Sequence, residues 1–368
     1  MKKRMLAGLT ALMLLLSGCS SLLERDYLHV TAHNTTPTAE GDPSVLRAEN
    51  YQELVNGLIY FISQGMETGS IRLYSDSEDV DAELDAACLE VVQEDPLGSY
   101  AVEYIKYSIS SIVTYYEADV QITYRRTREQ INSIVSATGT TAIRSELETA
   151  LASFAPERVL RISYFDGNED YIRTLCQEAY YASPSVALDM PEVSVSIYPA
   201  DGRQRIVEIL LTYHLDLKEL ERRRELLHLN SQELVRSLWS SSGDQLLLNA
   251  GQGILDAGGY DPKGGATAYH ALLEGGADSQ GLALAMALLC QELELDGRVV
   301  SGTLHGRPHC WTVVSTESGW AHLDLSRLGD WENPFRTDSQ MMEAGYLWDT
   351  GSVPQCGEGS PPASSPSD

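Results

Sequence analysis

The sequence is short of cysteine, of positive charge and of long apolar runs, and each shortage excludes a class of protein. Six cysteines in 368 residues are too few and too irregularly spaced for a disulfide-rich scaffold, and neither a CxxC pair nor a His-rich cluster predicts a zinc site. Lys and Arg number 26 against 53 Asp and Glu, giving a formal net charge of −27 that repels nucleic-acid phosphates. We therefore expect no nucleic-acid partner, no metal and no cofactor.

Apolar residues gather near the N-terminus, in Leu6–Leu16, behind the basic head Met1–Met5. A membrane-spanning helix needs about 20 such residues, so this run fits the core of a signal peptide instead. It ends in Leu16-Ser17-Gly18-Cys19, which resembles the lipobox of bacterial lipoproteins, where the cysteine is acylated after cleavage. Residues 1–19 are thus predicted to be a signal peptide, and Cys19 to be the lipid anchor on the extracytoplasmic face of the cell membrane. The alternative is an ordinary cleaved signal in which Cys19 has no role.

The mature chain has room for two or three domains, and its 43% apolar and 21% charged residues are typical of packed globular proteins. Removal of three positive charges with the signal peptide takes the net charge to about −30. Residues 20–48 are polar and are predicted to be a tether. Residues 350–368 are rich in Ser, Pro and Gly and predict a disordered tail in which Cys356 is exposed.

The chain then repeats itself. Ile71-Arg72-Leu73-Tyr74 aligns with Leu160-Arg161-Ile162-Ser163, and Ile122-Thr123-Tyr124 with Leu211-Thr212-Tyr213, both at an offset of 89 residues. Two further matches have an offset of 88 residues: Cys88 with Cys176, and Pro96 with Pro184. These anchors predict a duplication of an α+β unit in the order αβαββ, over residues 49–137 and 138–228.

Helical spacing places Cys88 and Cys176 on the buried faces of equivalent helices, where a thiol behaves as a small apolar side chain. A disulfide between them is the alternative. Each repeat ends in a basic run, Arg125-Arg126 and Arg222-Arg223-Arg224. These runs are interpreted as solvated helix faces among glutamates rather than as anion-binding patches.

Four segments beyond residue 228 follow one another in a suggestive order. Tyr269-His270-Ala271-Leu272-Leu273-Glu274-Gly275 precedes Ser279 and an Ala/Leu helix, and strand patterns follow in Arg298–Gly302, His309–Val314 and Trp320–Asp324. This order resembles the core of bacterial transglutaminase-like domains, a branch of the papain-like cysteine-hydrolase fold. The resemblance covers roughly residues 230–330 and implies a papain-like α+β domain at 229–349.

Carried over position by position, the resemblance implies a nucleophile at Ser279, a histidine at His309 and an acid at Asp324. In the family the nucleophile is a cysteine, whose pKa is lowered at a helix N-terminus. The histidine takes and delivers its proton, and the acid holds the imidazole tautomer.

Serine at position 279 departs from the family pattern. A hydroxyl is not ionised by a helix end or by a neighbouring imidazolium, so the ion pair that activates the cysteine is lost. Asp278 and Ser279 also suit a helix N-cap. We therefore expect a domain without catalysis, and the alternative is a serine-dependent amidohydrolase, peptidase or acyltransferase that uses Ser279, His309 and Asp324.

Three more residues are candidates to line the cleft of this domain: Trp311, His322 and Tyr269. An aromatic side chain there would grip a peptide, and the alternative is that these residues only pack. Cys310 lies beside His309, but strand alternation turns its side chain to the other face and predicts a core position, as for Cys290.

The sequence as a whole predicts a membrane-anchored lipoprotein whose transglutaminase-like domain binds a peptide or another amide-bearing polymer of the cell envelope. This ligand class follows from the chemistry of the family and from the expected location. A third possibility is a structural envelope protein in which the repeats matter and the cleft is vestigial.

Overall fold

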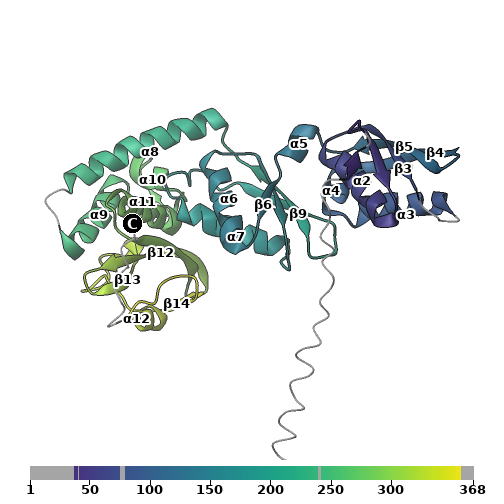
Figure 1. The fold of residues 1–368 in the computed structure, drawn as a ribbon. Coiled ribbons are helices and arrows are strands. Elements are labelled where there is room, and N and C mark those ends of the chain that lie inside the picture. The colour runs from purple at the N-terminus through teal and green to yellow at the C-terminus, as the bar shows by residue number, and fades with distance from the viewer. Residues whose placement is uncertain (1–36, 40, 75–78, 239–241, 358–368) are drawn as a thin grey trace, which may run out of the picture. The chain divides into compact units, whose positions relative to one another are not determined.

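The computed structural model describes residues 37–39, 41–74, 79–238 and 242–357 (Figure 1). The predicted signal peptide, Cys19, most of the predicted tether and the tail from residue 358 lie outside these residues. The described chain forms two compact units: unit 1 comprises residues up to 89 together with 105–122, and unit 2 comprises 90–104 together with the chain from 123. Over the described residues, no helix combines the length and the apolar character that crossing a membrane requires.

Unit 1 is built on a sheet with the strand order β1-β2-β3-β5-β4. Its elements are β1 (Thr38–Ala39), β2 (Val45–Ala48), α2 (Tyr51–Ser63), β3 (Thr68–Leu73), α3 (Val80–Gln93), β4 (Val102–Ile112) and β5 (Tyr115–Tyr124). Helix α2 begins where the Asn50 side chain accepts a hydrogen bond from the backbone N–H of Glu53. Its apolar face, which includes Phe61, is buried.

A second sheet lies in unit 2 and has the strand order β6-β7-β9-β8. The elements up to its last strand are α4 (Pro96–Ala101), α5 (Arg128–Asn132), β6 (Val135–Ala137), α6 (Thr140–Ala152), β7 (Glu157–Ile162), α7 (Glu169–Ala182), β8 (Glu192–Tyr198) and β9 (Arg205–Thr212). In both sheets a parallel strand pair is followed by an antiparallel one. Ile71 pairs with Ala118, and Leu160 pairs with Val207, which is the same register 89 residues later.

Each sheet therefore contains a parallel strand, β2 or β6, that the predicted αβαββ order lacks. Strand β2 lies in the segment predicted to be a tether, and it pairs in parallel with β3. Strand β6 lies in the segment assigned to the end of the first unit, and it pairs in parallel with β7 of the second. Strands of four and three residues are too short for a visible alternation of apolar and polar residues.

Helices α3 and α7 carry Cys88 and Cys176 on their buried sides. Both thiols are free, which confirms the predicted core positions and shows that the alternative of a disulfide is wrong. Burial raises the pKa of the Cys88 thiol to about 12 and that of Cys176 to about 11, so neither is a ready nucleophile.

The rest of unit 2 surrounds one buried helix, α11 (Ser279–Glu292). The other elements are α8 (Leu217–Ser237), α9 (Gly243–Ala257), β10 (Tyr260–Gly265), α10 (Ala268–Leu273), β11 (Gly297–Leu304), β12 (Arg307–Thr316), β13 (Gly319–Leu323), η1 (Leu325–Arg327), α12 (Asp338–Glu343) and β14 (Tyr346–Trp348). Helix α11 contacts α8, α9 and α10 as well as β11 and β12 (Figure 1). Its Ala/Leu sequence is apolar all round because it has protein on every side.

No break separates the second sheet from these helices. Leu175 and Tyr180 of α7 belong to the same apolar core as Leu284 and Leu288 of α11. The boundary predicted between residues 228 and 229 falls inside α8. The last strands carry the order β13-β12-β11-β14.

The predicted exposure of Cys356 is wrong. Its side chain is 1% exposed and packs in a separate small core with Trp311, Met341 and Tyr346. The backbone N–H of Cys356 donates to Oδ1 of Asp338 over 3.2 Å, which fixes the chain after β14 against α12. The composition of the segment is that of a tail, but its one buried side chain holds residues up to 357 in place.

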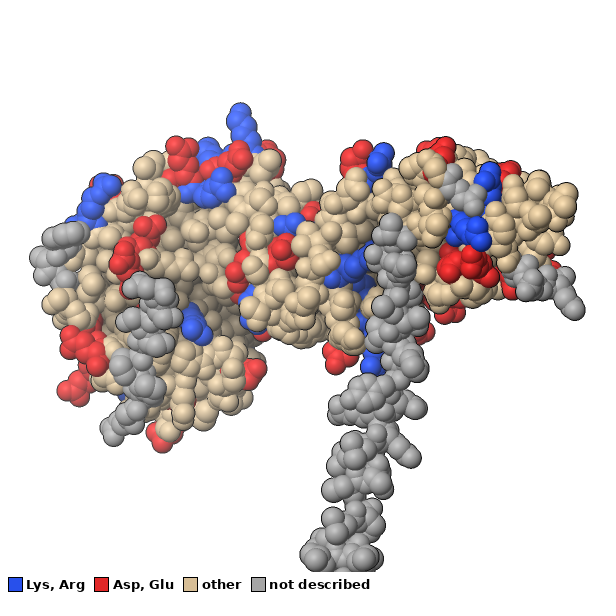
Figure 2. Space-filling model, in the orientation of Figure 1, with Lys and Arg blue, Asp and Glu red and all other residues tan. Residues whose placement is uncertain are grey.

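The prediction that both basic runs lie on solvated helix faces is wrong for the first run. Arg222 and Arg223 do pair with Glu219 on the surface of α8. Arg126, in contrast, lies 2.8 Å from a carboxylate oxygen of Glu208, whose side chain is only 7% exposed. Elsewhere, basic side chains lie among acidic ones over the face seen in Figure 2.

Candidate active site

The N-terminus of α11 presents Ser279 at the edge of the domain. The Asp278 side chain caps the helix by accepting from the backbone N–H of Gly281 over 2.9 Å. A side chain at position 281 would lie within 3 Å of the backbone of Gly265 and Thr267 and of the Ala277 side chain. Glycine there is thus required by close packing of the helix start against β10.

The hydroxyl of Ser279 is half-buried and makes one described hydrogen bond. Its oxygen accepts from the backbone N–H of Cys310 on β12 over 3.2 Å. No hydrogen bond joins Ser279 to His309 within residues 242–357. The strand that carries His309 therefore holds the serine through its backbone and not through the imidazole.

His309 and Asp324 form a buried pair. Nε2 of His309 lies 2.6 Å from Oδ2 of Asp324, which also accepts from the hydroxyl of Tyr346 over 2.7 Å. The other carboxylate oxygen accepts from the backbone N–H and the hydroxyl of Ser326. Because Nε2 faces the carboxylate, it carries the proton of a neutral ring, and Nδ1 is left as an acceptor.

The pKa of Asp324 is set by opposing effects. Burial raises it, but the hydrogen bond and charge of His309 and the hydrogen bonds from Tyr346 and Ser326 outweigh burial, so the pKa lies below its ordinary value. The carboxylate is therefore ionised at neutral pH and fixes the imidazole, as the acid of a hydrolase triad does.

Residues 252–325, which include Ser279, His309 and Asp324, match the model of the transglutaminase-like superfamily. The chain carries a transglutaminase-like domain. The three residues implied by the resemblance lie at the start of α11, on β12 and directly after β13, where Asp324 caps η1.

The solved structures that match this chain share little sequence with it. A TGase matches at 12% identity over 68% of this chain and 72% of its own, with a TM-score of 0.26. A protein from Cytophaga hutchinsonii, predicted to be a cysteine protease, matches at 13% identity over 37% of this chain and 63% of its own, with a TM-score of 0.24. A protein from Parabacteroides distasonis, predicted to be a protease, matches at 9% identity over 71% and 44%, with a TM-score of 0.22. The chain covers less than two thirds of the last two, and comparison with curated proteins gave no match.

The three predicted cleft residues of the transglutaminase-like domain do not line a cleft. Trp311, His322 and Tyr269 are 1%, 0% and 5% exposed. Trp311 stacks on His309, with ring centroids 6.2 Å apart at 24°, and Tyr269 lies beneath the guanidinium of Arg223 at 4.7 Å. Strand alternation places Trp311 on the face of His309, but α12 and β14 cover that face.

His322 belongs to a chain of hydrogen bonds behind the site. The indole N–H of Trp311 donates to Nδ1 of His322 over 2.8 Å, so the proton of the neutral ring is on Nε2 and is donated to Oδ1 of Asp338 over 2.8 Å. Burial lowers the pKa of His322, although Asp338 opposes this effect. His322 is therefore a neutral, orienting residue.

The same residues test whether the domain could hold a metal. Ligand atoms of His322, Asp338 and Cys356 lie within 4.8 Å of one another. A cation on Nε2 of His322 would displace its proton to Nδ1, where it would face the indole N–H of Trp311. Burial also raises the pKa of the Cys356 thiol to about 12. The donor set fits a hydrogen-bonded support better than a metal site.

The buried neutral His322 predicts a loss of stability in mild acid. Its folded pKa lies below the unfolded value of about 6.5, so its contribution is present above that pH and is lost as the pH falls toward the folded pKa. Thermal unfolding at pH 7.5, 6.0 and 5.0 should show a falling Tm, by roughly 2–4 °C for each kcal/mol lost.

His322→Gln should flatten this dependence on pH, whereas His305→Gln, at an exposed histidine without a described ion pair, should leave it unchanged. Equal slopes for the wild type and His322→Gln would show that the ring is not held neutral.

Two contacts of the site were not predicted from the sequence. Tyr346 lies after the family core, and only its place on β14 next to β11 brings its hydroxyl to Asp324. Tyr181 comes from the second sheet's helix α7 and donates to Oε1 of Gln280, the neighbour of Ser279, over 3.0 Å. Cys310 is 7% exposed, and burial raises its pKa to about 11, which agrees with the predicted core position.

Proposed function

We propose that this chain is an exported, lipid-anchored protein whose transglutaminase-like domain binds peptides or other amide-bearing polymers without thiol catalysis. One observation supports the proposal: the hydroxyl oxygen of Ser279, where the resemblance implies the nucleophile, accepts from the backbone N–H of Cys310 and is not hydrogen-bonded to His309. The buried His309–Asp324 pair then serves to hold β12, β13 and β14 together, since its carboxylate is hydrogen-bonded on both oxygens.

The supports for each part of this proposal differ. Lipid anchoring rests on the sequence around Cys19, and the ligand class rests on the family chemistry. Loss of thiol catalysis rests on serine, whose hydroxyl is not ionised by a helix end as a thiol is.

A serine-dependent amidohydrolase or acyltransferase is the second candidate, and a specific observation favours it. The hydroxyl proton of Ser279 has no acceptor among the described residues, and the side chain is half-buried. Rotation of the hydroxyl toward the proton-free Nδ1 of His309 would assemble a serine–histidine–aspartate triad.

A serine-directed fluorophosphonate probe decides between these candidates. We expect the intact mass of the folded mature protein to stay unchanged after incubation, because a hydroxyl that is not paired with a base is a weak nucleophile. Peptide mapping would locate any adduct. A gain of one probe at Ser279 that disappears in both Ser279→Ala and His309→Asn would overturn the proposal in favour of the serine enzyme.

A further inference from the structure

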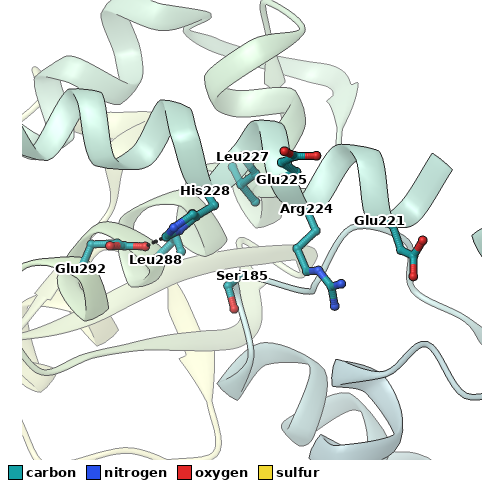
Figure 3. A pocket seen from close by; sticks show the side chains of 8 residues that line it. All are labelled: Ser185, Glu221, Arg224, Glu225, Leu227, His228, Leu288 and Glu292. Carbon is teal, nitrogen blue, oxygen red and sulfur yellow. Dashed lines mark ion pairs between the residues drawn. The ribbon is translucent and has the colours of Figure 1, made fainter. Parts of the chain in front are cut away.

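A cavity of about 580 Å³ lies against α8 and the second half of α11, away from Ser279 (Figure 3). Leu288 and Glu292 line it, nine and thirteen residues after Ser279 on the same helix. At 1.5 Å per residue these positions are roughly 14 and 20 Å along the axis from the serine. The cavity is therefore a second candidate site in unit 2, independent of the function proposed above.

The cavity holds a carboxylate at one end and a guanidinium toward the other. His228 and Glu292 meet at one end, where Nδ1 of His228 lies 3.5 Å from Oε1 of Glu292. Arg224 extends into the other end, and the side chains of Leu227, Leu288 and Ser185 lie between them (Figure 3). An apolar stretch between a carboxylate and a guanidinium complements a ligand that has an ammonium group at one end and a carboxylate at the other.

Arg224 differs from the other two arginines of its run. Arg222 and Arg223 pair with Glu219, but the described part of the chain offers Arg224 no ion pair. Its Nη1 donates to the backbone carbonyl of Ala152, and its guanidinium lies 5.3 Å from the centre of the Phe154 ring. These contacts fix the stem and one nitrogen, and they leave Nε and Nη2 to donate to a ligand carboxylate.

Glu292 is arranged in a similar way. Its Oε1 lies 3.5 Å from Nδ1 of His228 and also accepts a 3.5 Å hydrogen bond from the hydroxyl of Ser231. Among the residues that the structure describes, Oε2 of Glu292 has no hydrogen-bond partner, so it can accept from an ammonium group. Glu221 and Glu225 also line the cavity, on the same helix as Arg224, and they disfavour a ligand that carries only negative charge.

The distance between the two ends limits the length of the ligand. Arg224 and His228 are one helical turn apart, about 6 Å along α8, and Glu292 lies beyond His228. An extended chain covers at most about 3.3–3.6 Å per residue, so two or three residues reach from Glu292 to Arg224. We infer that this cavity binds a short peptide with free ends, its ammonium group on Glu292 and its carboxylate on Arg224.

Titration calorimetry with trialanine tests this inference on the whole mature protein. Trialanine should bind, and trialanine with an acetylated N-terminus and an amidated C-terminus should bind at least tenfold more weakly. Arg224→Gln should weaken trialanine binding about 10–100-fold, because a hydrogen bond to a charged group is lost. Arg222→Gln, at the neighbouring arginine that is already paired, should bind as the wild type does.

Singly blocked peptides assign the two ends. The C-terminally amidated peptide should be insensitive to Arg224→Gln, and the N-acetylated peptide should be insensitive to Glu292→Gln. Arg224→Lys, which keeps the charge, should recover part of the affinity. This recovery would show that the loss in Arg224→Gln does not come from a folding defect. Absence of trialanine binding at about 10 mM, equal affinity for the doubly blocked peptide, or equal losses for Arg222→Gln and Arg224→Gln would each overturn the inference.

Discussion

Ser279→Cys is expected to create a reactive thiol at the candidate site. The new side chain would stand at the start of α11, beside the strand that carries His309, and both a helix N-terminus and a neighbouring imidazolium lower the pKa of a thiol. With a pKa near 6 in place of about 8.5, the fraction of thiolate at pH 6 rises by roughly two orders of magnitude. The lower nucleophilicity of a more acidic thiol reduces the resulting gain in reaction rate by about one order of magnitude.

Alkylation of the introduced thiol by iodoacetamide at pH 6 should therefore proceed about tenfold faster than that of a free thiol, with a rate nearly flat up to pH 8. The native cysteines provide an internal background. Burial raises the pKa of Cys290 to about 12 and that of Cys310 to about 11, and both side chains are buried. Peptide mapping after a short incubation should find the label at position 279.

The control is the double variant Ser279→Cys/His309→Asn. Without the imidazole, the thiol should react at pH 6 like an ordinary exposed cysteine. Tyr346→Phe in the Ser279→Cys background should lie in between, since Asp324 then keeps three of its four hydrogen bonds. If the thiol of Ser279→Cys reacts no faster than a free thiol at pH 6, His309 is not placed to serve a nucleophile. The serine-enzyme candidate would then fail together with this prediction.

The sequence predicted those parts of the site that lie on strongly patterned segments. The Ala/Leu helix that starts at Ser279, the strand that carries His309 and the strand that ends directly before Asp324 lie where their patterns place them, because a buried helix and alternating strands have recognisable periods. Cys88 and Cys176 are buried for the same reason.

The predictions that are wrong depended on contacts that the sequence does not show. Trp311 shares a strand face with His309, and the sequence predicts that this face lines a cleft. Tyr346 and Asp338 arrive there from segments after the family core, and they bury it. Cys356 was placed in a tail because Gly, Ser and Pro surround it, yet one small apolar side chain was enough to seat the segment. Periodicity reports whether a face is buried, not which distant segment buries it.

Composition alone also misread the first basic run. The composition of the run predicts a solvated face. Arg126 instead pairs with Glu208, a buried side chain on β9 of the second sheet. Its guanidinium lies 5.1 Å from the ring centre of Tyr100, which is 0% exposed, and Tyr100 packs edge-on against Tyr198 at 5.6 Å. Helix α4 contacts β8 and β9 and brings Tyr100 to this position.

Arg126→Met is accordingly expected to destabilise unit 2 more than any other single change proposed here. It would leave the Glu208 carboxylate, 7% exposed, without a charged partner, and breaking a buried ion pair typically costs about 3–5 kcal/mol. Because the Arg126 side chain is 22% exposed, we expect about 3 kcal/mol, or a fall of roughly 6–12 °C in Tm measured by calorimetry.

The double variant Arg126→Met/Glu208→Leu separates the two origins of that loss. Removing both charges removes the desolvation penalty, so the double variant should recover most of the stability or exceed the wild type. Arg173→Met breaks an exposed pair with Glu169 on α7 and should cost less than about 1 kcal/mol. If Arg126→Met costs no more than Arg173→Met, water reaches Glu208 and the run is a solvated face after all. If the double variant is as unstable as Arg126→Met, packing of the arginine stem against Tyr100, rather than charge, stabilises this side of the sheet.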